Sequence, residues 1–122
     1  MEVEVSNGEV VDKVTILKIK LEKIKEDDKI KNIQKEYDIL MSSIESFLVF
    51  EEFETLYEVN LQLWEVEDDI RDKERLNEFD EDFISLARSV YRLNDERAKI
   101  KRQINDKTNS NLVEEKSYKE WN

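Results

Sequence analysis

The chain has 122 residues, of which 42% are charged and 39% hydrophobic, and its 31 acidic and 20 basic side chains give a net charge of −11. It contains no cysteine and no histidine, which excludes disulfides, zinc sites with thiolate or imidazole ligands, and catalysis by Ser-His or Cys-His pairs. Its length predicts a single domain, residues 1–122, that is large enough to bury a core between three or four helices.

The negative charge is concentrated in the middle of the chain. Residues 45–82 contain 15 acids and three bases, whereas the rest of the chain contains 16 acids and 17 bases. The middle segment would repel a phosphate backbone or an anionic membrane surface, so we expect no nucleic-acid partner and no membrane partner. The N-terminal sequence has no basic leader and the chain has no long apolar run, which predicts a cytoplasmic protein.

The chain has no proline and one glycine, Gly8, and its apolar residues recur at steps of three and four. This pattern predicts long helices. Residues 1–5 alternate polar and apolar side chains and are expected to form a short extended arm. Ser6 followed by Glu9 has the spacing of a capping box, which predicts that the first helix begins there.

A polar run, KEDDK at 25–29, follows the first helix. It predicts a turn in which Asp27 or Asp28 is the N-cap of a second helix, marked by apolar residues over 30–47. The first two helices would then form an antiparallel hairpin. Because the run contains neither glycine nor proline, one continuous helix over 6–44 is the alternative.

The second half of the chain predicts another helical hairpin. A third helix is expected over 51–76, and Asn77 or Asp80 is expected to cap a fourth helix. The helical region as a whole covers 6–108, and the polar run TNSN then introduces a C-terminal arm over 109–122. The sequence therefore predicts an all-α fold, a helical bundle of two antiparallel hairpins with about four helices and a short N-terminal extended arm.

An acidic patch on the third predicted helix is one candidate site. Carboxylates three or four residues apart share a helix face and are able to hold a divalent cation such as Mg²⁺; these are Glu65, Asp68, Asp69 and Asp72. In this respect the patch resembles the all-helical nucleotide pyrophosphohydrolases, although those enzymes take their acids from two helices. The facing segment, 88–102, is basic, so we expect the patch to form ion pairs across the helix interface and to hold no cofactor.

A second candidate site is a polar cluster between the third and fourth predicted helices. It consists of Trp64, Glu67, Arg71, Arg88, Tyr91, Asn94 and Arg97. One interpretation is a small pocket in which the planar guanidinium of Arg97 binds an anionic ligand. The other is a buried ion pair, such as Glu67 with Arg97, that fixes the register of the helices. We favour the ion pair.

Three aromatic residues, Trp64, Tyr91 and Trp121, are able to stack on a base or a sugar. Aromatic residues at helical spacing are more often part of a core, and we expect core packing. A polar interruption in the first helix consists of Asp12, Lys13 and Thr15, and we expect Lys13 to be solvated and not to act as an amine nucleophile.

Four strings in the sequence are familiar when they are taken together: VSNGEVVDKVTILKIKLEKI, LWEVEDDIRDKE, FISLARSVYRLNDERAKIKRQIN and LVEEKSY. They resemble a family of short bacterial proteins and appended domains catalogued as a domain of unknown function. The resemblance covers nearly the whole chain and implies a small, mostly helical intracellular domain, with no activity attached. The matching strings contain the whole polar cluster, which points by analogy to a shared surface or pocket.

These patterns lead to two functional hypotheses. The favoured one is a non-enzymatic protein-interaction or self-association module, whose partner is another protein or a second copy of the chain in a homo-oligomer. The alternative is a ligand-binding protein or a Mg-dependent, nucleotide pyrophosphohydrolase-like protein that uses the acidic patch.

Overall fold

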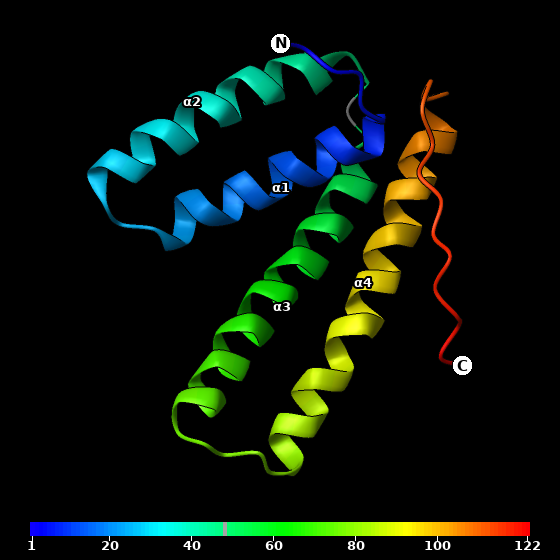
Figure 1. Ribbon diagram of the computed structural model, residues 1–122. Coiled ribbons are helices and arrows are strands. Elements are labelled where there is room, and N and C mark those ends of the chain that lie inside the picture. The colour runs from blue at the N-terminus through cyan, green and yellow to red at the C-terminus, as the bar shows by residue number, and fades with distance from the viewer. Residues whose placement is uncertain (48) are drawn as a thin grey trace.

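The computed structural model describes residues 1–47 and 49–122 and consists of two helical hairpins that meet at one end (Figure 1). The first hairpin is formed by α1 (Asn7–Lys23) and α2 (Asp27–Ile44), and a short 3-10 helix, η1 (Glu45–Phe47), follows it. The second is formed by α3 (Phe50–Arg75) and α4 (Glu81–Lys107). The described residues contain no strand, so the predicted all-α class and the two hairpins are confirmed.

The ends of the first hairpin agree with most of the sequence signals. Ser6 is the N-cap of α1, and its hydroxyl oxygen accepts a hydrogen bond from the Glu9 backbone N–H at 3.1 Å. The predicted turn is present, so the alternative of one continuous helix is wrong. Glu26 occupies the N-cap position of α2 without a side-chain hydrogen bond, and the expected caps Asp27 and Asp28 are instead the first two residues of the helix.

In the second hairpin, Asp80 is the N-cap of α4 and accepts a hydrogen bond from the Phe83 backbone N–H at 3.0 Å. The C-terminal arm, 109–122, has no helix or strand and runs back alongside α4 (Figure 1). None of the helices that the structure describes has the length and apolar character needed to cross a membrane.

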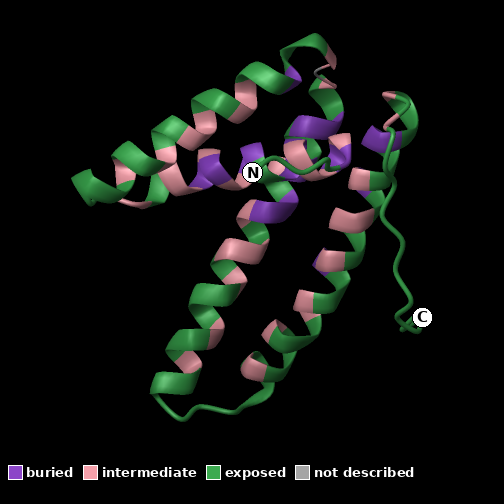
Figure 2. Cartoon of the chain, turned by 45° about the horizontal axis from the view of Figure 1, so that its top comes forward, coloured by how far each residue is buried: buried purple, intermediate pink, exposed green. Residues whose placement is uncertain are grey.

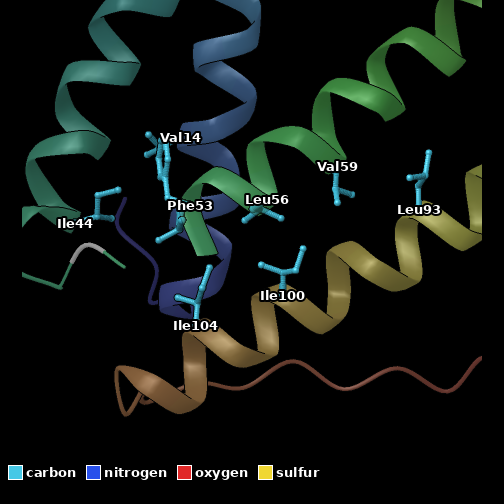
Figure 3. Close-up of a cluster of buried hydrophobic side chains, with 9 residues drawn as sticks. Val14, Ile44, Phe53, Leu56, Val59, Leu93, Ile100 and Ile104 are labelled. Carbon is cyan, nitrogen blue, oxygen red and sulfur yellow. The ribbon is translucent and has the colours of Figure 1, made fainter. Parts of the chain in front are cut away.

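The hydrophobic core lies where the two hairpins meet (Figures 2 and 3). α1 lies against α2, α3 and α4, whereas α2 lies against α1 and η1. The main cluster of buried apolar side chains comes from all four helices and consists of Val11, Val14, Ile44, Phe53, Leu56, Val59, Leu93, Ile100 and Ile104. Burial of these side chains provides the main driving force for joining the hairpins.

At the other end of the second hairpin, no third helix of the described part of the chain lies over α3 and α4. The buried residues of α3 lie between Glu52 and Asn60, and those of α4 between Leu93 and Asn105. Over residues 61–92 no side chain is fully buried, and the apolar residues that face the partner helix are half-buried or exposed (Figure 2). We call this part of the molecule the distal limb.

Gly8 allows α1 to approach α4 closely. A Cβ at this position would lie 2.5 Å from the Lys101 carbonyl oxygen and 3.0 Å from Asn105 Oδ1. The Gly8 backbone N–H, one of the N–H groups without a partner inside α1, donates to Asn105 Oδ1 at 2.7 Å. The close approach of the two backbones and the hydrogen bond to Asn105 together hold the first turn of α1 against the end of α4.

Candidate functional site

The centre of the site is Asp12, which lies on α1 and is only 1% exposed. Arg97 of α4 donates from Nε to Oδ1 at 2.9 Å and from Nη2 to Oδ2 at 2.5 Å, so the two side chains form a bidentate ion pair. Asn60 of α3 donates from Nδ2 to Asp12 Oδ1 at 2.9 Å and to the Thr15 hydroxyl at 2.8 Å. We call these four residues the Asp12 cluster.

The Asp12 cluster is satisfied internally. The Thr15 hydroxyl donates to the Asp12 carbonyl oxygen at 2.7 Å. The hydrogen bond to Asp12 raises the pKa of Arg97, although burial acts in the opposite direction. Each charge therefore compensates the other inside the protein.

A buried arginine pair was expected at Arg97, but the partner differs from the predicted one. Glu67 is exposed and accepts from Arg71 Nε at 3.3 Å, within α3. The carboxylate opposite Arg97 comes instead from Asp12 on α1. The prediction of a Glu67–Arg97 pair is wrong because it considered only α3 and α4, whereas α1 packs on both of them.

A groove of about 430 Å³ lies beside the Asp12 cluster, between α1 and the α3–α4 hairpin. Its lining is apolar where Ile16 and Ile19 face Leu63, Trp64 and Val90. Polar groups contributed by Asn60, Asn94 and Arg97 join this lining, and Glu67, Asp68 and Arg71 complete it. We call this the inner groove. It brings together five of the seven residues predicted as a polar cluster.

The other two predicted cluster residues, Arg88 and Tyr91, do not line the inner groove. Tyr91 is 39% exposed, and its ring contacts that of Trp121 in the C-terminal arm edge-to-face, with centroids 5.9 Å apart. A hydrogen bond from Arg88 lowers the pKa of Tyr91, and the charge of Arg92 contributes. The core packing expected for Tyr91 and Trp121 is therefore not what the structure shows.

The four carboxylates of the acidic patch are all exposed: Glu65, Asp68, Asp69 and Asp72. Within the described residues no three Asp, Glu, His or Cys side chains are grouped so that they could hold a metal ion. Asp72 forms an ion pair with Arg75 on the same helix. The patch is thus a solvated helix face whose carboxylates do not converge on one point.

The expected charge compensation between the acidic patch of α3 and the basic segment of α4 that faces it is wrong. The two helices are neighbours, yet in the described part of the chain no ion pair joins the segment 64–72 to the segment 88–97. Lys73 pairs with Glu78 and Asp80 in the turn between the helices. Arg97 and Lys101 of α4 instead pair with Asp12 and Glu9 of α1, and Lys107, at the end of α4, pairs with Glu52 at the start of α3.

A second polar junction connects α1, α4 and the C-terminal arm. Lys101 Nζ lies 2.7 Å from Glu9 and 3.2 Å from Glu114, and the Ser6 hydroxyl donates to Glu114 at 3.1 Å. Burial lowers the pKa of Lys101, but the hydrogen bond to Glu9 and the nearby acids outweigh it, and the net pKa is raised. This junction holds the start of the arm against α4.

Three residues of the Asp12 cluster were not predicted as site residues: Asp12 and Thr15 were noted only as part of a polar interruption in the first helix, and Asn60 was not singled out. A signal for them existed, because each is a polar residue among buried apolar neighbours, Val11 and Val14 in α1 and Leu56 and Val59 in α3. A polar residue on an apolar stripe indicates a partner on another element. Lys13, by contrast, is exposed and pairs with Glu36 of α2.

The comparisons with known proteins agree with the resemblance read from the sequence. A family of unknown function, DUF6165, matches residues 1–121 of the chain. No curated protein and no solved structure matches it. Since the match extends over nearly every residue, including those of the Asp12 cluster and the inner groove, the chain belongs to the DUF6165 family.

Proposed function

We propose that the protein is a non-enzymatic protein-interaction module that binds a cationic, amphipathic helix of a partner in the inner groove. The observation that carries this proposal is the open apolar lining of the groove beside an acidic helix. Leu63, Trp64 and Val90 remain half-buried because no helix among the described residues covers the distal limb. When a partner removes such apolar side chains from water, the free energy of the complex is lowered.

The shape of the groove suits a helix. α1 forms one side, and the seam between α3 and α4 forms the base, so the surface already has two ridges of side chains. A partner helix packed against the seam would form a three-helix layer with α3 and α4, at the usual interaxial distance of about 8–10 Å. Docking of an amphipathic helix through residues spaced three and four apart is a common mode of peptide recognition.

The charge of the groove selects the sign of the partner. Glu67 and Asp68 lie in its lining, and residues 45–82, which include most of α3, hold 15 acids and three bases. Of the two, Glu67 shares its charge with Arg71, whereas Asp68 has no ion-pair partner among the described residues. Lysines and arginines flanking the apolar face of a partner helix would find carboxylates on this side of the groove.

The polar groups of the groove support binding and not catalysis. Arg97 and Asp12 are engaged with each other, and Asn60 holds both Asp12 and Thr15. The Arg97 side chain remains 30% exposed, so it presents N–H groups to the groove while the Asp12 carboxylate compensates its positive charge. Such donors suit backbone carbonyl or amide oxygens of a bound segment.

Self-association, which the sequence also predicted, is the second binding mode. Two copies that met through their inner grooves would bring two acid-rich α3 helices together, and the like charges would oppose the contact. A cationic partner therefore fits this surface better than a second copy does. Size-exclusion chromatography with light scattering measures the mass in solution, and a stable dimer would favour self-association over the heterologous partner.

The test uses two designed helical peptides of about 14 residues, about 21 Å long, with identical apolar positions and either lysine or glutamate elsewhere. The chain has two tryptophans, so a Trp121→Phe variant makes Trp64 the only tryptophan, whose emission is selected by excitation at a wavelength that tyrosine does not absorb. We expect the lysine peptide to shift the Trp64 emission saturably and the glutamate peptide to have no effect. An equal response to both peptides, or a response to neither, would refute the proposal.

Matched substitutions locate the binding surface. Val90→Lys places a positive charge in the groove and should weaken lysine-peptide binding by about tenfold or more. Ile39→Lys makes the same kind of change on α2, where Ile39 is 60% exposed and outside the groove, and should leave binding unchanged. Circular dichroism verifies that both variants keep the helical content of the parent. Equal losses in both variants would argue against the inner groove.

A further inference from the structure

A second cleft lies between α4 and the C-terminal arm and does not depend on the function proposed for the inner groove. Its volume is about 580 Å³, within the range of about 300–1,000 Å³ that small-molecule sites occupy. Its lining comes from Val90, Tyr91, Asn94 and Asp95 of α4 and from Lys116, Tyr118, Lys119 and Trp121 of the arm. We call it the aromatic cleft.

The three aromatic rings of the cleft are not used by the core. Tyr91 is 39%, Trp121 49% and Tyr118 82% exposed. Trp121 has a fixed position, because its indole N–H donates to Asp95 at 2.7 Å and its ring contacts Tyr91 at an interplanar angle of 61°. Exposed rings held in place by polar contacts form a surface on which a flat ligand is able to stack.

The cations around the cleft give it a local charge opposite to that of the whole protein. Lys116 and Lys119 have no ion-pair partner among the residues that the structure describes. The guanidinium of Arg92 lies 4.8 Å from the centre of the Trp121 ring, and Lys116 Nζ lies 5.7 Å from that of Tyr118. The acid-rich segment 45–82 contributes no residue to the cleft.

We infer that the aromatic cleft binds a small aromatic molecule that carries a phosphate group, such as a mononucleotide. The ring of the ligand stacks against Trp121 and Tyr118, and the side-chain amide of Asn94 offers a donor and an acceptor to its edge. Lys116 and Lys119 neutralise the phosphate. The aromatic half of the ligand thus contacts the rings and its phosphate contacts the lysines, so the whole ligand should bind more tightly than either half alone.

The test compares adenosine 5′-monophosphate with its two halves, adenosine and inorganic phosphate. In a Trp64→Phe variant, Trp121 is the only tryptophan, and we expect its fluorescence to be quenched saturably by the nucleotide. Adenosine and phosphate should each bind about tenfold more weakly or worse. Isothermal titration calorimetry on the unaltered protein measures the same affinities without any substitution. No binding of the nucleotide at about 1 mM, or equal binding of adenosine, would overturn the inference.

Substitutions separate the aromatic and the ionic contributions. The double variant Lys116→Gln with Lys119→Gln should weaken nucleotide binding about fivefold and leave adenosine binding unchanged. Tyr118→Ala should weaken both by a similar factor. The control is Lys31→Gln with Lys35→Gln, which makes the same change of net charge on exposed positions of α2. If the control weakens nucleotide binding as much as the cleft variants do, the effect is non-specific and the inference fails.

Discussion

Arg97 and Asp12 form a bidentate ion pair although 85 positions separate them in the sequence. The pair joins α4, in the second hairpin, to α1, in the first, and the Asp12 carboxylate also accepts a hydrogen bond from Asn60 of α3. Three of the four helices thus have their positions fixed by one buried carboxylate. The register of the two hairpins depends on this pair as well as on apolar burial.

Breaking the pair from either side should have unequal effects. Arg97→Met leaves the Asp12 carboxylate buried without its counterion and should lower the free energy of unfolding by about 3–5 kcal/mol. Asp12→Asn leaves a partly exposed guanidinium and should cost about 1–3 kcal/mol. The double variant Asp12→Leu with Arg97→Met should recover much of the loss. Urea unfolding measures all three, and an Asp12 variant less stable than the Arg97 variant would contradict this account.

Gly8→Ala should destabilise the protein even though alanine is the better helix former. The new Cβ would lie 2.5 Å from the Lys101 carbonyl oxygen, and α1 would have to move away from α4. The expected loss is about 2 kcal/mol after the gain of about 1 kcal/mol in helix propensity. Thermal unfolding is the measurement. Asn32→Ala, at an exposed position of α2, is the control and should be neutral or slightly stabilising.

Tyr57 should give the protein a stability that is lost at high pH. Its hydroxyl donates to both oxygens of Glu22, at 2.7 and 2.9 Å. This hydrogen bond, with burial and nearby acids, raises the pKa of Tyr57 from 10.0 to about 12. Because the folded-state pKa is raised, the contribution is complete below pH about 10 and disappears as the pH rises through about 12.

An ultraviolet absorbance titration of tyrosinate tests this prediction. Of the four tyrosines, the one that ionises at the highest pH should be missing from the Tyr57→Phe variant. The same late step should move toward lower pH in Glu22→Gln, which keeps an acceptor oxygen for the Tyr57 hydroxyl but removes the negative charge. A titration curve unchanged by Tyr57→Phe would show that another tyrosine accounts for the late ionisation.

Two leucines of the second hairpin should respond differently to the same substitution. Leu56 is 0% exposed and lies in the main core cluster, so Leu56→Ala should lower the free energy of unfolding by about 3 kcal/mol. Leu76, which follows α3, is 65% exposed, and Leu76→Ala should change it by less than about 0.5 kcal/mol. Comparable losses at the two positions, measured by urea unfolding, would mean that the distal limb is packed more tightly than its exposure indicates.

The sequence was sufficient for the local features of the fold. The Ser6 and Asp80 caps, the turn before Asp27 and the helical spacing of apolar residues were all readable, because each depends on residues within one or two helical turns. The predicted third helix, 51–76, differs from α3 by one residue at each end. Such boundaries are set by local hydrogen bonds, and the residues that form these bonds are close together in the sequence.

The partners of the site residues were not readable in the same way. Arg97 was recognised as a polar residue on an apolar stripe, but periodicity shows which face of a helix is buried and not which helix covers it. Both Glu67 and Asp12 were chemically suitable partners, and only the crossing of α1 over α4 decides between them. The arm of the aromatic cleft was still less accessible, since an extended segment such as 109–122 carries no helical period.

All fully buried residues of the second hairpin lie near one end of it, which has a consequence for how the native protein opens. The turns of α3 and α4 farthest from the junction of the four helices are able to unfold locally and re-form while that junction stays folded. Protection of backbone amides from hydrogen exchange should therefore decrease gradually from the junction to the loop 76–80 between α3 and α4. A bound helix would flatten the gradient, because it would supply the missing cover. The exposed apolar residues at this end of the hairpin would then be the source of the protein's affinity for a partner helix.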